Sequence, residues 1–303
     1  MIAFPHSQRW DDWVTQAWNM AFGRRWVAGK DDWIVGPRGE LGGIGEKVIA
    51  QIAAKERLVV ERNGSGVGLM DSAQAFGALR AELHPEILKF YTETSDYDFE
   101  VWTRWQPVWG AFGKLVDRLF ARRLEQLCLP HDPLATSRGI SSEVIVLRQK
   151  DGRICHRVWL RKLISSGGVI YSGFYSEVTT PAGVPAVKVV FPLPKGSATV
   201  VMRTTSLAGG GLRLESAGRR DGDAGFYFVV EDRKGGLWLH YLRAFHERID
   251  VYVDPSGTLR ADHTMRLFGR LVYSLHYKIT RQAALPLERV TERRSEVAAR
   301  SLT

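Results

Sequence analysis

The sequence has little cysteine and no long hydrophobic run. Only Cys128 and Cys155 occur among 303 residues, which excludes a small domain held together by disulfides and gives no reason to expect an oxidising compartment. No window approaches the roughly 18 consecutive apolar residues that a membrane-spanning helix needs. The N-terminal segment also lacks the basic and then apolar stretches of a secretory signal. We therefore expect a cytoplasmic protein.

Motifs for common cofactors are absent as well. Residues 42–45 and 64–68 are rich in glycine but have neither GxGxxG spacing after a strand nor a GK[ST] ending, so they do not predict nucleotide binding. The eight histidines form no HExxH motif and no close cluster with cysteine, so their spacing does not support a metal site. Ser65 lacks the surroundings of a nucleophile elbow. We expect no nucleotide, flavin or metal cofactor.

The composition is that of a globular protein with a slight basic excess. Hydrophobic residues make up 45% of the chain, enough for a sizeable core, which excludes a disordered chain. Lys and Arg outnumber Asp and Glu by 42 to 33, a net charge of +9, and this favours anionic partners. However, the basic residues are dispersed and no nucleic-acid-binding motif is present, so we do not expect nucleic acid as a partner.

The sequence predicts a Trp-rich helical region over the first part of the chain, residues 1–135. Apolar residues recur at intervals of three and four over residues 8–22, 44–58 and 73–83, as on one face of an amphipathic helix. In the first segment the face comprises Trp10, Trp13, Val14, Ala17, Trp18, Ala21 and Phe22, and in the second it includes Val48, Ile49, Ile52 and Ala53.

The longest apolar stripe covers residues 107–127. Pro107 fits the first turn of a helix and Pro130 ends the pattern. The stripe predicts a helix packed on a sheet. The alternative is a basic helix at a membrane surface, with Trp102, Trp105 and Trp109 near the interface.

Residues 136–281 show the alternation of β-strands. Eight turn clusters rich in Gly, Pro, Asp and Ser divide this stretch into short runs of Val, Tyr, Phe and Leu, which predicts about nine or ten strands joined as hairpins. The fold class is therefore α+β, with N-terminal helices packed on a mostly antiparallel β-barrel or strongly curved β-meander. Such a barrel would enclose a ligand in a lipocalin-like or similar way. Residues 282–303 read as a polar tail.

The inward face of the predicted strands carries several polar groups. If the more apolar alternate positions point inward, that face includes tyrosines and one histidine. Because a solid core favours groups without hydrogen-bonding demand, this pattern predicts a cavity for a ligand. The alternative is that no cavity is present and the tyrosine hydroxyls reach solvent at the rim of the sheet. The predicted ligand-binding residues are Tyr171, Tyr175, Tyr241, Phe191, Met202, Phe228 and Trp109.

Candidate acid–base residues lie on the last two strands. We assign proton transfer to His263 with Tyr277 or Tyr273. A shift of one residue in register would turn His276 inward instead, together with Ser274 and Lys278. Asp262 precedes His263 directly, so on a regular strand the two side chains face opposite sides and do not pair.

Three further residues share one face of an earlier strand. Arg157, Trp159 and Arg161 alternate in the sequence, and two guanidinium groups beside an indole are suited to hold a carboxylate or a phosphate. The commoner outcome for such a row is a solvated basic face, and we expect that here.

Two functions follow from these features. The first is a cofactor-independent cyclase or isomerase that binds a bulky hydrophobic molecule, such as a polyketide, an isoprenoid or a lipid-like compound, and fixes its conformation. The second is a non-catalytic carrier or sensor of lipid-like ligands with a helical face that docks on a membrane. Both have a hydrophobic small molecule as partner, and the second adds peripheral membrane contact.

Overall fold

A computed structural model shows most of the chain. The residues that it describes are 10–40, 44–62, 64–71, 76–107, 109–110, 126–128 and 139–282. The helix predicted over 107–127 and the tail after Gln282 lie largely outside the described residues.

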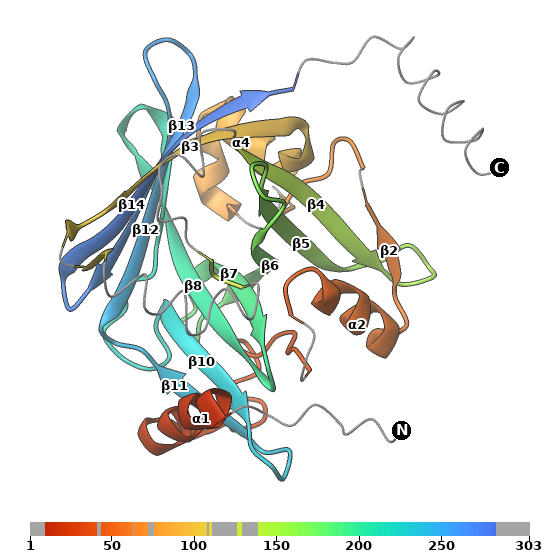
Figure 1. The fold of residues 1–303 in the computed structure, drawn as a ribbon. Coiled ribbons are helices and arrows are strands. Elements are labelled where there is room, and N and C mark those ends of the chain that lie inside the picture. Colours follow the sequence, from red (N-terminus) through yellow and green to blue (C-terminus); the bar gives the residue numbers. More distant parts are fainter. Residues whose placement is uncertain are drawn as a thin grey trace, which may run out of the picture.

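Ten strands, counted over the described residues, form one antiparallel sheet that closes on itself (Figure 1). They are β3 (Tyr97–Trp105), β4 (Ile140–Arg148), β5 (Ile154–Leu163), β6 (Val169–Thr179), β7 (Pro185–Leu193), β8 (Gly196–Leu207), β9 (Gly211–Glu215), β12 (Phe245–Val253), β13 (Leu259–Leu267) and β14 (Arg270–Arg281). Around the barrel the order is β8, β7, β6, β5, β4, β3, β14, β13, β12 and β9, and β9 pairs with β8 again. The predicted antiparallel barrel is therefore confirmed.

One barrel strand comes from the stretch in which only helices were predicted. In β3 the buried residues Tyr97, Phe99 and Val101 alternate with exposed Asp98 and Glu100. This strict period of two is the pattern of a half-buried strand. The strand fills the position between β14 and β4. The expectation of helices alone before residue 136 was incomplete.

The sheet branches at β8. The first half of β8 pairs with β10 (Gly225–Glu231), and its second half pairs with β9. From β10 the branch continues to β11 (Leu237–Tyr241) and then to the two-residue strand β1 (Arg24–Arg25). A further short strand, β2 (Val59–Glu61), pairs with β4.

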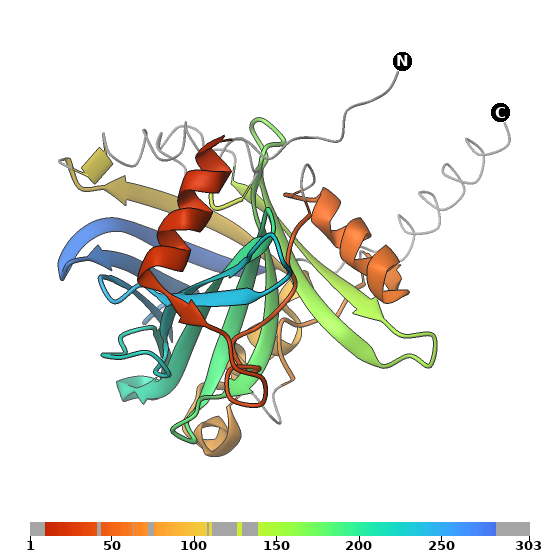
Figure 2. The same cartoon turned by 90° about the horizontal axis from the view of Figure 1, so that it is seen from below.

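Three α-helices in the described residues pack around the barrel (Figures 1 and 2). They are α1 (Trp10–Phe22), α2 (Lys47–Glu56) and α4 (Pro85–Thr92), with short 3-10 helices at Gly77–Ala81, Thr94–Asp96 and Ala208–Gly210. The predicted buried face of α2 is correct, because Val48, Ile49, Ile52 and Ala53 are all buried. They pack on the outer side of β4 and β5, while α4 adds Phe90 and Tyr91 to the barrel interior.

The orientation of α1 differs from the one that its apolar stripe predicts. Trp18 and Phe22 are 41% and 71% exposed, whereas Asn19 is buried. The Oδ1 atom of Asn19 lies 2.9 Å from Nδ1 of His240 on β11, and this buried polar contact faces the sheet. The Trp18 ring lies over the same imidazole, 4.5 Å between centroids. A satisfied polar pair therefore determines which side of α1 is covered, and part of the apolar face stays exposed.

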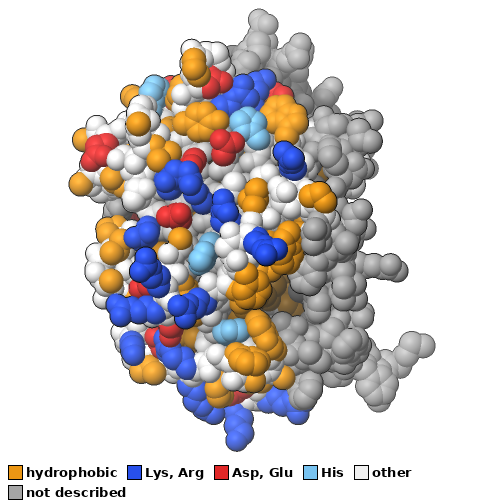
Figure 3. All heavy atoms as spheres, turned by 90° about the vertical axis from the view of Figure 1, so that its left-hand side faces the viewer, with side chains coloured by type: hydrophobic (Ala, Val, Ile, Leu, Met, Phe, Trp, Pro, Cys, Tyr) orange, Lys and Arg blue, Asp and Glu red, His pale blue; other side chains and the backbone are white. Residues whose placement is uncertain are grey.

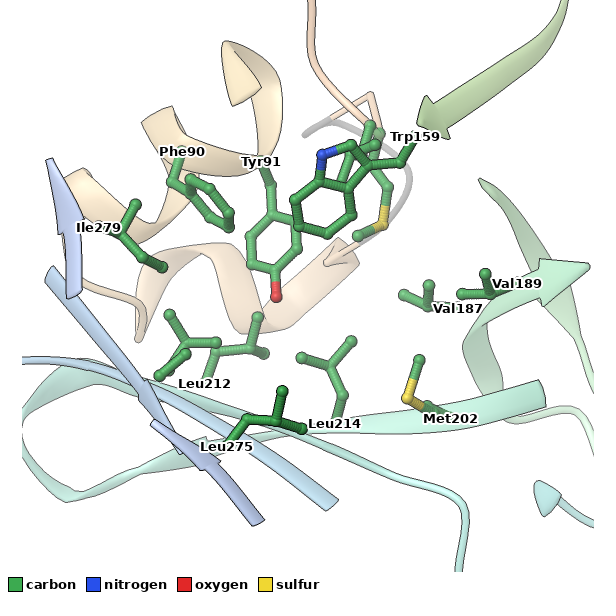
Figure 4. Packing of buried hydrophobic residues seen from close by; sticks show 14 of the residues in the cluster. Phe90, Tyr91, Trp159, Val187, Val189, Met202, Leu212, Leu214, Leu275 and Ile279 are labelled. Atoms are coloured by element: carbon green, nitrogen blue, oxygen red, sulfur yellow. The ribbon is translucent and has the colours of Figure 1, made fainter. Parts of the chain in front are cut away.

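The barrel interior holds the larger core and its outer surface holds two smaller ones. Inward positions predicted by alternation, such as Val187, Val189 and Phe191 of β7, belong to the interior cluster. The sequence around β14 is in the expected register as well, because Tyr273, Leu275, Tyr277 and Ile279 are all in that cluster. The close view in Figure 4 shows residues of the interior cluster from both sides of the barrel.

We expect the packing of α2 to contribute measurably to stability. Replacing Ile49, which is fully buried against β4 and β5, with alanine should lower the free energy of unfolding by about 2–5 kcal/mol. Lys55→Ala on the exposed side of the same helix should change it by no more than about 0.5 kcal/mol. Urea denaturation of both variants measures the difference. If both substitutions changed the free energy of unfolding equally, the packing of Ile49 on β4 and β5 would not stabilise the protein.

Candidate functional site

The barrel encloses a cavity of about 130 Å³. Its walls are mainly apolar and come from α4 and from strands on all sides of the barrel. Figure 4 shows Phe90, Tyr91 and Trp159 on one side, facing Leu214 and other residues on the opposite side. An engineered cavity of roughly 150 Å³ binds benzene, so this volume suits one ring or a short chain.

Six of the predicted site residues line this cavity. They are His263, Tyr277, Tyr171, Tyr175, Phe191 and Met202. Their side chains come from β6, β7, β8, β13 and β14, so alternation along each strand correctly identified residues that the closed barrel brings together.

Four other predicted residues lie outside the cavity lining. Tyr273 is fully buried, and its ring packs 4.4 Å from that of Trp105. Phe228 packs against Phe226 and Trp18. Trp109 follows β3 and does not line the cavity.

Tyr241 lies in a different core. Its ring packs 5.0 Å from that of Tyr227 in an outer cluster. It lies on β11 in the side branch of the sheet, where the buried face of the strand no longer points into the barrel. Alternation predicted that this face is buried, but it does not distinguish between two cores.

Arg161 is a buried cation in the cavity wall. Its side chain is only 3% exposed, and Phe99, Trp159 and Tyr277 surround the guanidinium with ring centroids 4.6, 4.8 and 5.2 Å from Cζ. Its Nε and Nη2 atoms are buried without a hydrogen-bond partner. Among the described residues, no carboxylate lies within ion-pair distance of it. The row Arg157, Trp159 and Arg161 does share one face, but the expected solvated face was wrong because that face points into the barrel.

Burial keeps two phenols near Arg161, those of Tyr175 and Tyr277, protonated. Tyr171 is the direct neighbour of Arg161 across β5 and β6, and the hydroxyls of Tyr171 and Tyr277 are close enough to interact with the guanidinium. Burial raises the pKa of Tyr277 to about 12, although Arg161 opposes this rise. Burial and the neighbouring Tyr171 raise the pKa of Tyr175 well above its ordinary value. At neutral pH the hydroxyls of Tyr175 and Tyr277 can therefore donate hydrogen bonds.

Two further titratable groups line the same cavity. Burial, with a smaller contribution from the charge of Arg161, lowers the pKa of His263 to about 4, and the Nε2 atom of His263 has no partner. Burial raises the pKa of Glu247 to about 7. The imidazole is thus neutral at pH 7, while the carboxyl is about half protonated.

The sequence analysis missed Glu247 and assigned Arg161 to a solvated face, although both continue inward rows of their strands. Glu247 continues the inward row of Ile249 and Val251 on β12, and Arg161 continues the row of Trp159 on β5. In the sequence, a charged residue next to a row of alternating apolar residues is easily interpreted as the point where the buried row ends. In a barrel with an internal cavity it is instead part of the lining.

The wall beside Arg161 is irregular. The register between β5 and β6 shifts after Arg161, so that Ile170 and Tyr171 both line the cavity. Pairing of β6 with β7 begins only at Phe174, and the Gln126 side chain bonds the backbone of Ser172 in the gap, with distances of 2.9 and 3.2 Å. Bulges of this kind re-aim side chains and occur often next to functional sites.

The outer face of β13 and β14 carries a separate polar cluster. Asp262 and His263 point to opposite sides, as predicted. Asp262 pairs across the strands with His276, at 2.6 Å between Oδ1 and Nδ1, and accepts a hydrogen bond from the Tyr252 hydroxyl at 3.1 Å. His276 therefore lies outside the barrel, and the alternative register is excluded.

Charge on the outer surface is mixed. On the face shown in Figure 3, Lys and Arg side chains are interspersed with Asp and Glu, and hydrophobic side chains line a hollow. Among the described residues, no helix has the length and apolar character needed to cross a membrane. The same part of the chain contains no group of three or more His, Cys, Asp or Glu side chains placed to hold a metal ion.

Comparisons with known proteins give no family for this chain. No protein-family model matches it, and no match is found among curated proteins or solved structures. We therefore infer the function from the chemistry of the cavity.

We predict that Glu247 makes stability decrease with rising pH. In the folded protein its carboxyl keeps the proton up to about pH 7, whereas the unfolded chain releases it near its ordinary value of 4.5. Between these values the folded state binds more protons, so the free energy of unfolding falls as pH rises, by about 3 kcal/mol in total.

His263 has the opposite effect between pH 4 and 6.5, because its pKa is lowered on folding. The test is therefore the difference between the wild type and Glu247→Gln, measured by urea denaturation from pH 4.5 to 8. The stability of the variant relative to the wild type should increase across this range. A constant difference would mean that Glu247 titrates normally.

Proposed function

We propose that the barrel binds a hydrophobic small molecule in its interior cavity and catalyses a cofactor-independent isomerisation or cyclisation of that molecule. The observation that carries this proposal is the set of titratable groups in an otherwise apolar cavity, His263, Glu247 and Tyr277, whose pKa values all depart from their ordinary range. Shifted groups gathered in a cavity are typical of catalytic sites. In this proposal the protein works as a lipocalin-like, ligand-enclosing barrel.

The cavity volume limits the part of the ligand that reacts. About 130 Å³ accommodates one ring or a short branched chain. A polyketide, isoprenoid or lipid-like substrate would therefore place a single ring or branch beside the titratable groups.

The three groups suit a proton transfer. The step requires a ligand with a carbon–carbon double bond separated from a carbonyl group by one carbon. Ionised Glu247 removes a proton from that intervening carbon, and the C–H electron pair forms a new C=C bond while the carbonyl π electrons move to the oxygen. The Tyr277 hydroxyl donates a hydrogen bond to that oxygen. Protonated Glu247 then returns the proton to the far carbon of the original double bond, the C=O bond re-forms, and the remaining C=C bond is conjugated with it. Neutral His263 is a second proton acceptor in the same cavity.

A non-catalytic carrier or sensor is the alternative. Its supporting observation is the exposure of Trp18 and Phe22 on α1, which gives the molecule an aromatic surface outside the barrel. In this case the cavity groups only position the ligand, and turnover is absent although binding is intact.

Ligand binding should depend on the free volume of the cavity. Ala261→Leu places three extra carbon atoms in the lining and should weaken the binding of toluene at least tenfold. Thr205→Leu on the exposed outer face of β8 is the control and should leave the affinity unchanged. Calorimetric titration measures both, and thermal unfolding verifies that both variants are folded. Equal affinity in Ala261→Leu would show that toluene binds elsewhere.

Catalysis should be detectable with a probe of one ring. We expect the wild type to convert 3-cyclohexen-1-one into its conjugated isomer faster than buffer does, as followed by ultraviolet absorbance. Glu247→Gln and Tyr277→Phe should each slow this conversion by about 10²-fold or more and should bind toluene like the wild type. Toluene binding without any isomerisation by the wild type would support the carrier instead.

A further inference from the structure

We infer that Arg161 makes the cavity selective for ligands that carry a carboxylate on an apolar body. This inference rests on the proposed function, because it assigns one end of the ligand that the cavity is proposed to bind. Its basis is the position of an uncompensated guanidinium inside an apolar wall.

Among the residues that the structure describes, no carboxylate serves as a counterion for Arg161. A guanidinium stays protonated even when buried, and a buried charge is strongly unfavourable unless an opposite charge pairs with it. At 3% exposure Arg161 is also out of reach of bulk water. Such a group in the lining of a cavity is explained by an anion that arrives with the ligand.

Glu247 is the carboxyl group of the cavity lining, and it does not serve as the counterion. No ion pair joins it to Arg161. A carboxylate paired with a guanidinium has a lowered pKa, whereas that of Glu247 is raised. Glu247 therefore does not neutralise the charge of Arg161.

The free atoms of Arg161 fit a carboxylate. Nε and Nη2 lie on the same edge of the guanidinium, and both lack partners. This edge offers two parallel N–H donors, the arrangement that binds both oxygens of a carboxylate. The rings of Phe99, Trp159 and Tyr277 surround the guanidinium and hold it in place. A single cation matches a monoanion better than a doubly charged phosphate.

A further unpartnered atom belongs to another residue of the same cavity lining. The Nε2 atom of His263 is buried without a partner, and the imidazole is near enough to Arg161 for the guanidinium charge to affect it. The hydroxyl of Tyr171, directly across from Arg161, adds a donor. Tyr171 and His263 thus add hydrogen-bonding groups to the cavity lining that contains Arg161.

The test compares benzoate, benzamide and toluene, which share one ring and differ in the charged group. Calorimetric titration of the full chain at pH 8 should show that benzoate binds at least tenfold more tightly than benzamide, since charge-assisted hydrogen bonds are the stronger kind. Arg161→Met should abolish this preference and keep the affinity for toluene within threefold. Arg203→Met, at an exposed outer position, is the matched control and should behave like the wild type.

Each outcome is decisive. Equal affinity of the wild type for benzoate and benzamide, with toluene bound, would overturn the role of Arg161 and leave the proposed apolar site intact. Failure of all three probes to bind would overturn the proposed function together with this inference. The wild-type comparison needs no variant, so it decides the question even if Arg161→Met does not fold. In that case Arg161→Lys, which keeps the charge but not the two-donor edge, should retain only part of the preference.

Discussion

The closure of the sheet at β8 is the constraint on which the rest of the structure depends. β8 pairs with β7 along one edge and with β10 and then β9 along the other. Only its last residues close the ring. Because the ring is closed, inward positions on distant strands face one another across a short distance. Arg161 and Tyr277 are far apart in sequence, yet the Tyr277 ring packs against the guanidinium of Arg161.

Strand number explains why polar groups are tolerated inside. A barrel of about eight strands is just wide enough for its side chains to fill, and a larger one leaves interior space. With ten strands over the described residues, this barrel retains a cavity although Phe90 and Tyr91 of α4 occupy part of the interior. The aromatic rings around Arg161 supply a partly favourable environment for its charge. They leave the hydrogen-bonding edge of the guanidinium without a partner.

Alternation in the sequence was sufficient to predict His263, Tyr277, Tyr171 and Tyr175 as cavity residues, because a strand that is buried on one face has to present a period of two. Alternation failed for Tyr241, because β11 belongs to the side branch of the sheet that starts at β8. Tyr241 therefore packs in an outer core and not in the barrel interior.

Two other features could not be predicted from the sequence. They are the pairing between distant segments and the burial of charged side chains. The strand β3 was missed because residues 1–135 were predicted to be helical, and the position of β3 depends on long-range pairing with β14. Arg161 and Glu247 could not be identified by a rule that places charged side chains in water. Their places in inward rows are visible in the sequence, but their burial depends on a cavity that forms only when distant strands close the barrel.

A ligand carboxylate bound to Arg161 would affect the protonation of other groups in the cavity. The positive charge of Arg161 opposes protonation of His263, and burial favours the neutral form of Glu247. A bound carboxylate would cancel the charge of Arg161, which removes one of the two effects that keep His263 neutral. A negative charge in the same cavity also favours the neutral form of Glu247, which lines it. Both effects favour protonation, so by linkage the binding of a carboxylate and the uptake of protons would support each other in this site. In this proposal, the residue that selects the ligand also affects the protonation of the groups proposed to act on it.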